Sequence, residues 1–175
     1  GGQLLLAKNA IDQENMENFA DYGAAVLEKL GVTVRLNTEA TADMIRELNP
    51  YAVFIATGAN GFKLKVPGYD RDNVYTAEEY LAGNVELKDK KIAVIGGGIT
   101  GCETAALAAS RGNQVTVVEM LPSVCNNIYN DSRTEIIHDL EKFHVDVLTS
   151  HAIREVTDHG VRAENVADGK LTAVD

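Results

Sequence analysis

The sequence predicts an α/β fold in which a parallel sheet carries an antiparallel β-meander, with a partial β-α-β segment ahead of them. From Lys91 onward, apolar strand-like segments alternate with helical patterns, which is typical of a parallel sheet with helices on its faces. A glycine-rich string, G-x-G-x-x-G, joins the first of these strands to the first of these helices. Residues 152–175 instead alternate with a period of two, which predicts the meander.

The N-terminal residues predict a helix followed by the β-α-β segment. Residues 14–31 place apolar side chains at helical spacing and end at Gly31, a residue suited to a left-handed helix cap. A strand is then expected over 32–38, a short helix opened by Thr41 over 41–48, and a second strand over 51–58. The apolar positions of the first helix are Phe19, Tyr22, Val26 and Leu30.

A boundary between two domains is expected in residues 58–73. This stretch is rich in glycine, contains a Pro-Gly pair and shows no apolar period. We therefore divide the chain into residues 1–65 and 66–175. Just beyond the boundary, Thr76 and Glu79 have the spacing of a capping box, which predicts a short helix that ends near Gly83.

The second part of the chain predicts five alternating elements before the meander. They are strand 91–97, helix 101–110, strand 114–119, helix 132–143 and strand 145–150. Ser132 and Glu135 repeat the capping-box spacing at the second helix. The buried face of that helix is expected to comprise Ile136, Ile137, Leu140 and Phe143.

The meander should turn at His159-Gly160 and at Asp168-Gly169. A doubly wound domain normally returns to its parallel sheet with one more strand after such an insertion. We therefore expect residues 66–175 to lack this last strand, and the chain to be a piece of a longer protein.

Composition limits the classes of partner. The 175 residues carry 16 Lys and Arg against 26 Asp and Glu, a formal charge of −10, so we expect neither nucleic acid nor a membrane as a partner. The sequence has no membrane-span or leader pattern, and its two cysteines form no disulfide framework, which favours the cytoplasm. Cys102 and Cys125 are expected to be a packing residue and a loop thiol. No metal site is expected, because the four histidines do not have the i, i+4 spacing of helical ligands.

Gly96, Gly98 and Gly101 have the spacing of a Rossmann-like dinucleotide-binding turn. The pattern follows an apolar strand, opens an alanine-rich helix and precedes a second strand. The first glycine permits the tight turn, the second leaves room for a pyrophosphate, and the third lets helix and strand pack closely. The phosphates would meet N–H groups at the helix N-terminus. The intervening residues expected at the same site are Gly97, Ile99 and Thr100. The alternative is a glycine turn without a ligand.

Glu119 ends the second strand, 119 − 101 = 18 residues after the last glycine. Its carboxylate can accept hydrogen bonds from both ribose hydroxyls of an adenosine, whereas a 2′-phosphate would be repelled, which favours NAD over NADP. Met120 follows at the same end and brings no positive charge. Replacing Glu119 by arginine should then invert the preference. The alternative is a solvated carboxylate at a strand end.

Several motifs together resemble a known family: "GGQLLLA", "LNTEAT", "VFIATGA", "VPGYD", "VIGGGITGCETA" and "VTVVEML". They closely resemble the C-terminal FAD/NAD(P)-binding portion, itself similar to pyridine nucleotide-disulphide oxidoreductases, of the NADH:flavin oxidoreductases. This family includes 2-enoate reductases, 2,4-dienoyl-CoA reductases and trimethylamine dehydrogenase. The resemblance covers nearly the whole chain.

The resemblance implies a longer parent protein. In that family a barrel with FMN and a 4Fe–4S cluster precedes one domain for FAD or ADP and one for NAD(P)H. Residues 1–65 would be a remnant of the FAD-binding domain, and residues 66–175 the NAD(P)-binding domain. The barrel and the rest of the FAD-binding domain would be the partners that this sequence does not contain.

The resemblance also implies further site residues. Glu103 would help to position the nicotinamide, although from the sequence alone it is merely a first-turn acid favoured by the helix dipole. Gly1, Gly2 and Gln3 would trail the first nucleotide-binding motif, and Ala40 would lie near the flavin-side adenine. The segment expected to pass close to FAD comprises Ala56, Thr57 and Gly58.

Two functions follow from these observations. In the first, the chain is the NADH-binding module of a flavin-dependent oxidoreductase of the NADH oxidase or enoate reductase type. Hydride would pass from NADH to FAD, and electrons on to an FMN site that reduces an activated C=C bond or another acceptor. In the second, the chain binds a dinucleotide or ADP as a structural module without turnover. Because no glycine fingerprint precedes Gly1, we expect the chain alone to be inactive.

Overall fold

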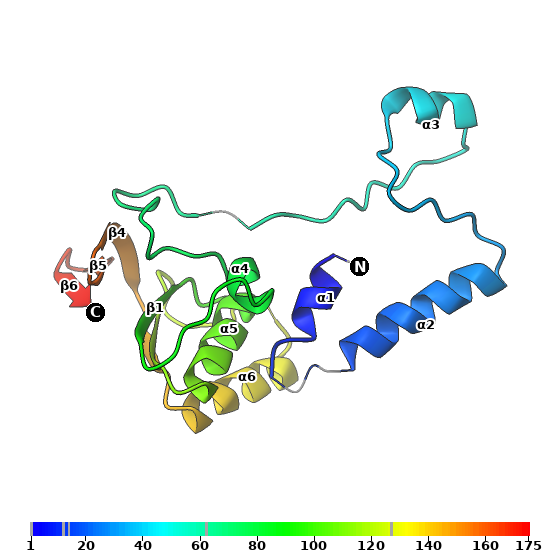
Figure 1. Cartoon of the computed structure of the whole chain (residues 1–175). Helices are drawn as coiled ribbons and strands as arrows, with labels where there is room; N and C mark the ends of the chain where they lie inside the picture. Colours follow the sequence, from blue (N-terminus) through cyan, green and yellow to red (C-terminus); the bar gives the residue numbers. More distant parts are fainter. Residues whose placement is uncertain (1, 12, 14, 62, 127) are drawn as a thin grey trace.

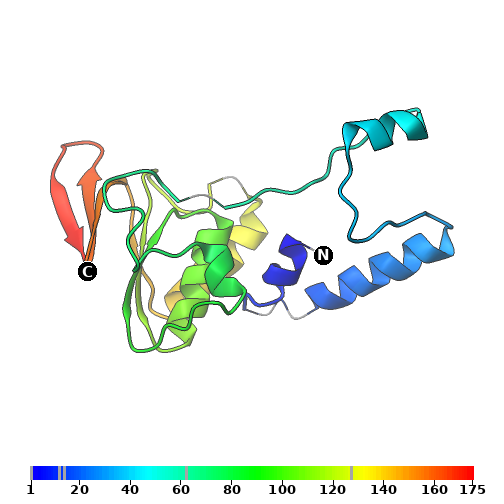
Figure 2. The ribbon, with the colours of Figure 1, turned by 45° about the horizontal axis from the view of Figure 1, so that its top comes forward.

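The structure has the predicted α/β class. The chain is represented by a computed structural model that describes residues 2–11, 13, 15–61, 63–126 and 128–175. It contains a three-stranded parallel sheet and a three-stranded antiparallel sheet. Helices cover the parallel sheet. Residues 16–61, which contain α2 and α3, form an arm that extends away from both sheets (Figures 1 and 2). The expected Rossmann-like arrangement with a meander is thus confirmed.

The parallel sheet has the strand order β1-β2-β3. β1 (Lys91–Ile95) pairs with β2 (Gln114–Val118), which pairs with β3 (Asp146–Leu148). The connections are helices α5 (Ile99–Ser110) and α6 (Asn130–Lys142), which contact each other on one face of the sheet (Figure 1). Because all three strands run in the same direction, their carboxyl ends meet at one edge, where ligands of such sheets bind.

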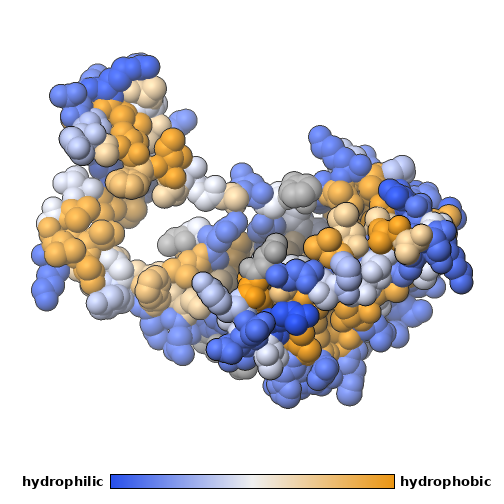
Figure 3. Space-filling view, turned by 180° about the vertical axis from the view of Figure 1, so that it is seen from behind, coloured by the Kyte–Doolittle hydropathy of each residue, from blue (hydrophilic) through white to orange (hydrophobic). Residues whose placement is uncertain are grey.

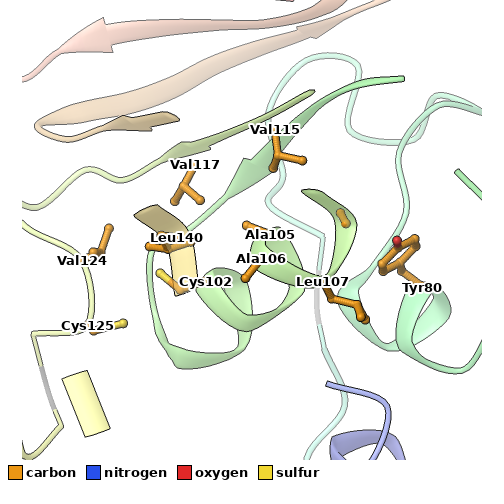
Figure 4. Packing of buried hydrophobic residues seen from close by; sticks show 11 residues of the cluster. Tyr80, Cys102, Ala105, Ala106, Leu107, Val115, Val117, Val124, Cys125 and Leu140 are labelled. Carbon is orange, nitrogen blue, oxygen red and sulfur yellow. The ribbon is translucent and has the colours of Figure 1, made fainter. Parts of the chain in front are cut away.

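The core beneath the helices is built from small residues of α5 and valines of β2. Figure 4 shows Val115 and Val117 facing the side of α5 that carries Ala105. All three side chains are fully or almost fully buried, and burying one valine contributes about 1.5–3 kcal/mol. Because the buried residues of α5 are mostly alanines, this helix can lie close to the sheet.

The meander covers the other side of the parallel sheet. It comprises β4 (His151–Thr157), β5 (Gly160–Asn165) and β6 (Leu171–Val174), which pair antiparallel in that order. Both predicted turns are confirmed. A second core lies between the two sheets; its buried residues are Val118, Ile153, Val156, Val161, Ala163 and Val174.

The start of α6 differs from the prediction. The helix begins at Asn130, after Tyr129 in extended backbone with ψ of 146°. Ser132 therefore lies inside the first turn, where its backbone is helical. An N-cap needs a non-helical backbone, so the capping box expected from Ser132 and Glu135 is wrong.

The other helix signals are confirmed. In α4 (Ala77–Leu81), the Thr76 hydroxyl accepts from the Glu79 N–H, and the Glu79 carboxylate accepts from the Thr76 N–H. The latter bond holds the pKa of Glu79 below its usual value. In α3 (Ala42–Leu48), the Thr41 hydroxyl accepts from the Met44 N–H.

The arm contains helices but not the two predicted strands. α2 (Met16–Lys29) has Leu30 as its C-cap, and Gly31 follows with a left-handed φ of 69°, as expected for a glycine just after a helix. Residues 32–38 and 51–58 do not pair with another strand among the described residues. A strand forms only against a neighbour that accepts its hydrogen bonds, so the β-α-β segment is reduced to α3 between two unpaired segments.

The arm consequently exposes apolar side chains. Leu36 is 78% exposed and Phe54 is 92% exposed. Figure 3 shows hydrophobic surface concentrated on the arm, which projects from the rest of the molecule. Within the described part of the chain, no helix has the length and apolar character needed to cross a membrane.

The N-terminus lies against the body rather than along the arm. α1 (Gln3–Ala7) contacts α2 and α4. The Asn9 side-chain amide donates to the carbonyl of Leu81 at 2.7 Å, and Ala10 is buried. Residues near the start of the chain therefore pack on the unit formed by residues 66–175, and the proposed division at residue 65 stays a prediction.

Candidate functional site

The glycine turn lies at the carboxyl edge of the parallel sheet, between the end of β1 and the start of α5 (Figure 1). Gly96 has a φ of 99° and its N–H donates to the carbonyl of Val118 at 2.9 Å. A positive φ of this size is readily adopted only by glycine. The turn is therefore fixed against the end of β2 by a glycine-specific backbone conformation.

Gly101 and Gly97 are constrained by close contacts. A Cβ at Gly101 would lie 2.0 Å from the carbonyl oxygen of Gly96, which confirms that this glycine lets helix and strand approach. A Cβ at Gly97 would lie 2.5 Å from Cγ1 of Val124. Neither position has room for a side chain.

Gly98 differs from both. It is the N-cap of α5, with extended backbone at φ −73° and ψ 179°. A Cβ built there would have no described atom within 4 Å. Nothing in the described part of the chain thus requires a glycine at this position, and the space in front of it is open.

The N-terminus of α5 faces this open space with N–H groups that have no acceptor within the helix. These groups belong to Ile99, Thr100 and Gly101. The helix dipole adds a partial positive charge at the same place. This end of α5 is therefore suited to an anionic group.

Glu119 follows β2 directly and is only 9% exposed. Its Oε2 accepts from the N–H of Gly97 at 2.6 Å, and its Oε1 accepts from the N–H of Leu121 at 2.7 Å. The alternative of a solvated carboxylate at a strand end is therefore wrong. The structure brings Glu119 and the glycine turn together, and an ionised carboxylate with two such bonds can still accept others.

The loop after Glu119 borders the site and contacts the glycine turn. Met120 is 59% exposed beside it. Cys125 has a left-handed φ of 54°, and its N–H donates to the carbonyl of Gly97 at 2.8 Å. The Arg133 guanidinium donates to the carbonyl of Val124 at 3.2 Å. Sequence reasoning missed Leu121, Val124 and Cys125 as supports of the turn, because their contacts depend on how the loop folds back.

The two cysteines lie together beneath the turn. Cys102 and Cys125 are both buried, and both are free thiols (Figure 4). Burial raises the pKa of the Cys102 thiol, and the neighbouring Cys125 raises it further. The expected packing role of Cys102 is thus confirmed, and Cys125, which lies in a loop as expected, is buried as well. Partial burial also raises the pKa of Glu103, one residue further along α5.

Flavin-side residues are only partly brought together. The side-chain amide of Gln3 donates to the carbonyl of Ala59 at 2.8 Å, which places Gly2 and Gln3 near the segment that contains Ala56, Thr57 and Gly58. Ala40 precedes α3 at the far end of the arm (Figure 1). Gly1 lies outside the described residues. Among the residues that are described, no group of three or more His, Cys, Asp or Glu side chains is arranged to hold a metal ion.

Comparisons with known proteins agree with this geometry. The family model described as pyridine nucleotide-disulphide oxidoreductase matches residues 46–175. The chain is 35% identical over 166 residues to an NADH oxidase of Thermoanaerobacter brockii, a match that covers 93% of this chain and 26% of that protein. It is 34% identical over 172 residues to a bilirubin reductase of Mediterraneibacter gnavus, with 98% of this chain and 26% of that protein covered.

A solved structure is similar as well. The match to a 2-naphthoyl-CoA reductase in complex with 2-naphthoyl-CoA has a TM-score of 0.83 and 31% identity, and covers 100% of this chain and 26% of that one. The chain thus spans about a quarter of the length of these relatives. The resemblance to NADH:flavin oxidoreductases is confirmed, and the chain belongs to the pyridine nucleotide-disulphide oxidoreductase family.

Proposed function

We propose that this chain binds NADH at the glycine turn and, within a longer protein, presents its nicotinamide to a flavin. The observation that carries the proposal is the assembly at one sheet edge of the turn, the N-terminus of α5 and the carboxylate of Glu119. In an adenosine diphosphate, the phosphates match the partial positive charge of the helix end, and the ribose hydroxyls match the acidic side chain.

The pyrophosphate is assigned to the open space at Gly98. The chain itself leaves the Cβ position empty, so an anion can approach the backbone there as closely as van der Waals contact allows. Gly97, Ile99, Thr100 and Gly101 belong to the same proposed contact surface. The site fits a diphosphate because N–H groups that have no acceptor within the helix point into it.

The adenosine ribose is assigned to Glu119 and the adjacent Met120. The remaining lone pairs of the carboxylate would accept hydrogen bonds from the two ribose hydroxyls. A 2′-phosphate would be repelled by the same charge, which supports NADH rather than NADPH as the ligand. Glu103, half-buried in the first part of α5, is the proposed contact at the nicotinamide end.

The proposed reaction is hydride delivery in an oxidoreductase of the NADH oxidase or enoate reductase type. When held by these residues, NADH would supply a hydride, for which FAD would be the acceptor in the longer protein. The role of this chain's residues is to bind and orient the dinucleotide. By the family resemblance, FMN and a 4Fe–4S cluster in the parent would carry the electrons to an activated C=C bond or another acceptor. The similarity to an NADH oxidase and to a bilirubin reductase supports a reductase of this kind.

The test is a pair of glycine substitutions. Gly98→Val places a side chain in the proposed pyrophosphate position, and its Cβ would meet no described atom within 4 Å, so it should fold and lose NADH binding in calorimetry. Gly23→Val, in helix α2, is the matched control, because a Cβ there also meets no described atom within 4 Å. It should bind NADH like the original chain.

Two results would contradict the proposal. Equal NADH binding by a folded Gly98→Val variant would show that the turn is not the phosphate site. Binding of ADP with no NADH-dependent bleaching of the flavin in the full-length protein would favour a structural nucleotide module without turnover.

A further inference from the structure

The buried carboxylate of Glu119 is bonded to two backbone N–H groups of the chain itself. Oε2 accepts from Gly97 at 2.6 Å and Oε1 accepts from Leu121 at 2.7 Å. The backbone of Glu119 is fixed too, because its N–H donates to Leu148 and its carbonyl accepts from His151, both at 2.9 Å. The side chain therefore has a defined place between the end of β2 and the glycine turn.

Gly97 is held from two sides. Its N–H is bonded to Glu119, and its carbonyl accepts from the N–H of Cys125 at 2.8 Å. A Cβ at Gly97 would lie 2.5 Å from Cγ1 of Val124 and 3.0 Å from the Cβ of Glu119, so both side chains pack closely on this peptide. The orientation of this peptide determines where Gly98 and the first N–H groups of α5 point, because Gly98 is the N-cap of that helix.

We propose that Glu119 is a positioning residue that holds the glycine turn in its phosphate-binding shape. The inference rests on the proposed dinucleotide site and adds a second task for this carboxylate. Two of its about four lone pairs hold the turn, and the others remain for the ribose. One side chain thereby links the ribose end of the ligand to the phosphate end.

This role changes the expected outcome of the arginine substitution. Arginine has five donors and no acceptor, so Glu119→Arg would leave the N–H of buried Gly97 unpaired and would remove the acceptor of the Leu121 N–H. The inversion toward NADPH that the sequence suggests should therefore not occur. We expect the affinity for both dinucleotides to fall, because the turn itself is displaced.

The first test compares ADP with 2′,3′-dideoxy-ADP, which has the same phosphates but cannot bond a carboxylate through its ribose. Glu119→Gln keeps the shape of the side chain but turns an NH₂ group toward one of the two backbone N–H groups. It should weaken both ligands by about tenfold or more, the range expected when a charged hydrogen bond is lost. Glu164→Gln is the control, because Glu164 bonds Arg154 on the meander surface, away from the turn.

The outcomes separate the two proposals. If Glu119→Gln weakens ADP and leaves dideoxy-ADP unchanged, Glu119 contacts only the ribose; the positioning role is overturned and the NADH site stands. If the original chain binds neither ADP nor NADH, both proposals are overturned. Weakening of both ligands in Glu119→Gln, with the control unchanged, supports the positioning role.

The second test needs no ligand. By NMR hydrogen exchange, the amides of Gly97 and Leu121 should be protected in the original chain and in Glu164→Gln, and should exchange at least tenfold faster in Glu119→Gln. Val115 and Val117 in β2 report on the overall fold and should be unaffected. Equal exchange rates of the Gly97 and Leu121 amides in Glu119→Gln and in Glu164→Gln would overturn the proposal. If Glu119→Gln does not fold, Glu119→Asp replaces it, because it keeps the charge and withdraws the oxygens by one methylene group.

Discussion

At the scale of single residues, the three motif glycines differ in what the fold demands of them. Gly96 needs a φ of 99°, and Gly101 needs the space taken by the Gly96 carbonyl. Gly98 has an ordinary φ and open space before it. Two glycines therefore serve the fold, and the third leaves open the space that we propose for the pyrophosphate.

Alanine substitutions separate these reasons. Gly101→Ala should lower the free energy of unfolding by about 1–3 kcal/mol, because its Cβ would meet the Gly96 oxygen at 2.0 Å. Gly98→Ala should change it by less than about 0.5 kcal/mol. Chemical denaturation of both variants measures the difference. Equal stability of the two would mean that helix and strand are farther apart than the structure has them.

The thiol of Cys102 should make the free energy of unfolding depend on pH in the alkaline range. Its pKa is raised in the folded chain by burial and by Cys125, so the folded state keeps a proton that the unfolded state releases above the ordinary value of 9.0. Stability from this thiol is complete below that pH and declines as the pH rises above it. The free energies of unfolding of the original chain and of Cys102→Ala, measured by denaturation between pH 7 and pH 10.5, should differ less as the pH rises. Parallel curves would contradict this assignment.

At the scale of elements, the helix starts offer a direct test of two capping boxes with the same sequence spacing. Thr76 caps α4 in the structure, whereas Ser132 lies inside the first turn of α6. Thr76→Ala should reduce stability by about 1 kcal/mol, and Ser132→Ala should not reduce it, since alanine is the better helix former. Thermal unfolding of the two variants checks this. A larger loss for Ser132→Ala would place the start of α6 where the sequence predicts it.

The elements that the sequence predicts correctly are those whose signals are local. The alternation from Lys91 to Leu148, the two glycine turns of the meander and the caps at Thr76 and Thr41 depend on residues a few positions apart. The segments 32–38 and 51–58 have strand-like sequences, but a strand needs a partner. The bonds of Glu119 to Gly97 and Leu121 also depend on distant folding, so the sequence suggests where this carboxylate lies but not what it holds.

At the scale of the whole molecule, the two proposed nucleotide sites differ in completeness. The residues assigned to NADH lie in one body, between β1 and the loop after β2. Those assigned to FAD are divided between the N-terminus, the segment near Ala59 and the far end of the arm. A site whose contacts are not held together gains little binding energy, because ordering them costs entropy.

We therefore expect the chain to bind FAD weakly and to purify without colour. Absorbance between 350 and 500 nm after desalting measures retained flavin. Addition of excess FAD followed by desalting is the control for loss during purification. A yellow protein with stoichiometric flavin would show that the arm folds over the N-terminus in solution.

The arm should be the first part of the chain to be cut by a protease. Residues 32–41 and 49–60 are extended, exposed and unpaired with any described strand, and such backbone fits a protease site without prior unfolding. The α5–β2 core, in which Val117 and Cys102 are completely buried, should resist.

Because α1 contacts α4 and Asn9 bonds Leu81, the N-terminal fragment should stay associated with the body after cleavage. Brief digestion followed by mass spectrometry locates the cuts. No residue of the proposed NADH site lies on the arm. Calorimetry on the nicked product should therefore give the same NADH affinity as for the intact chain. Cleavage first within residues 96–125, or loss of NADH binding on nicking the arm, would mean that the arm helps to hold the glycine turn.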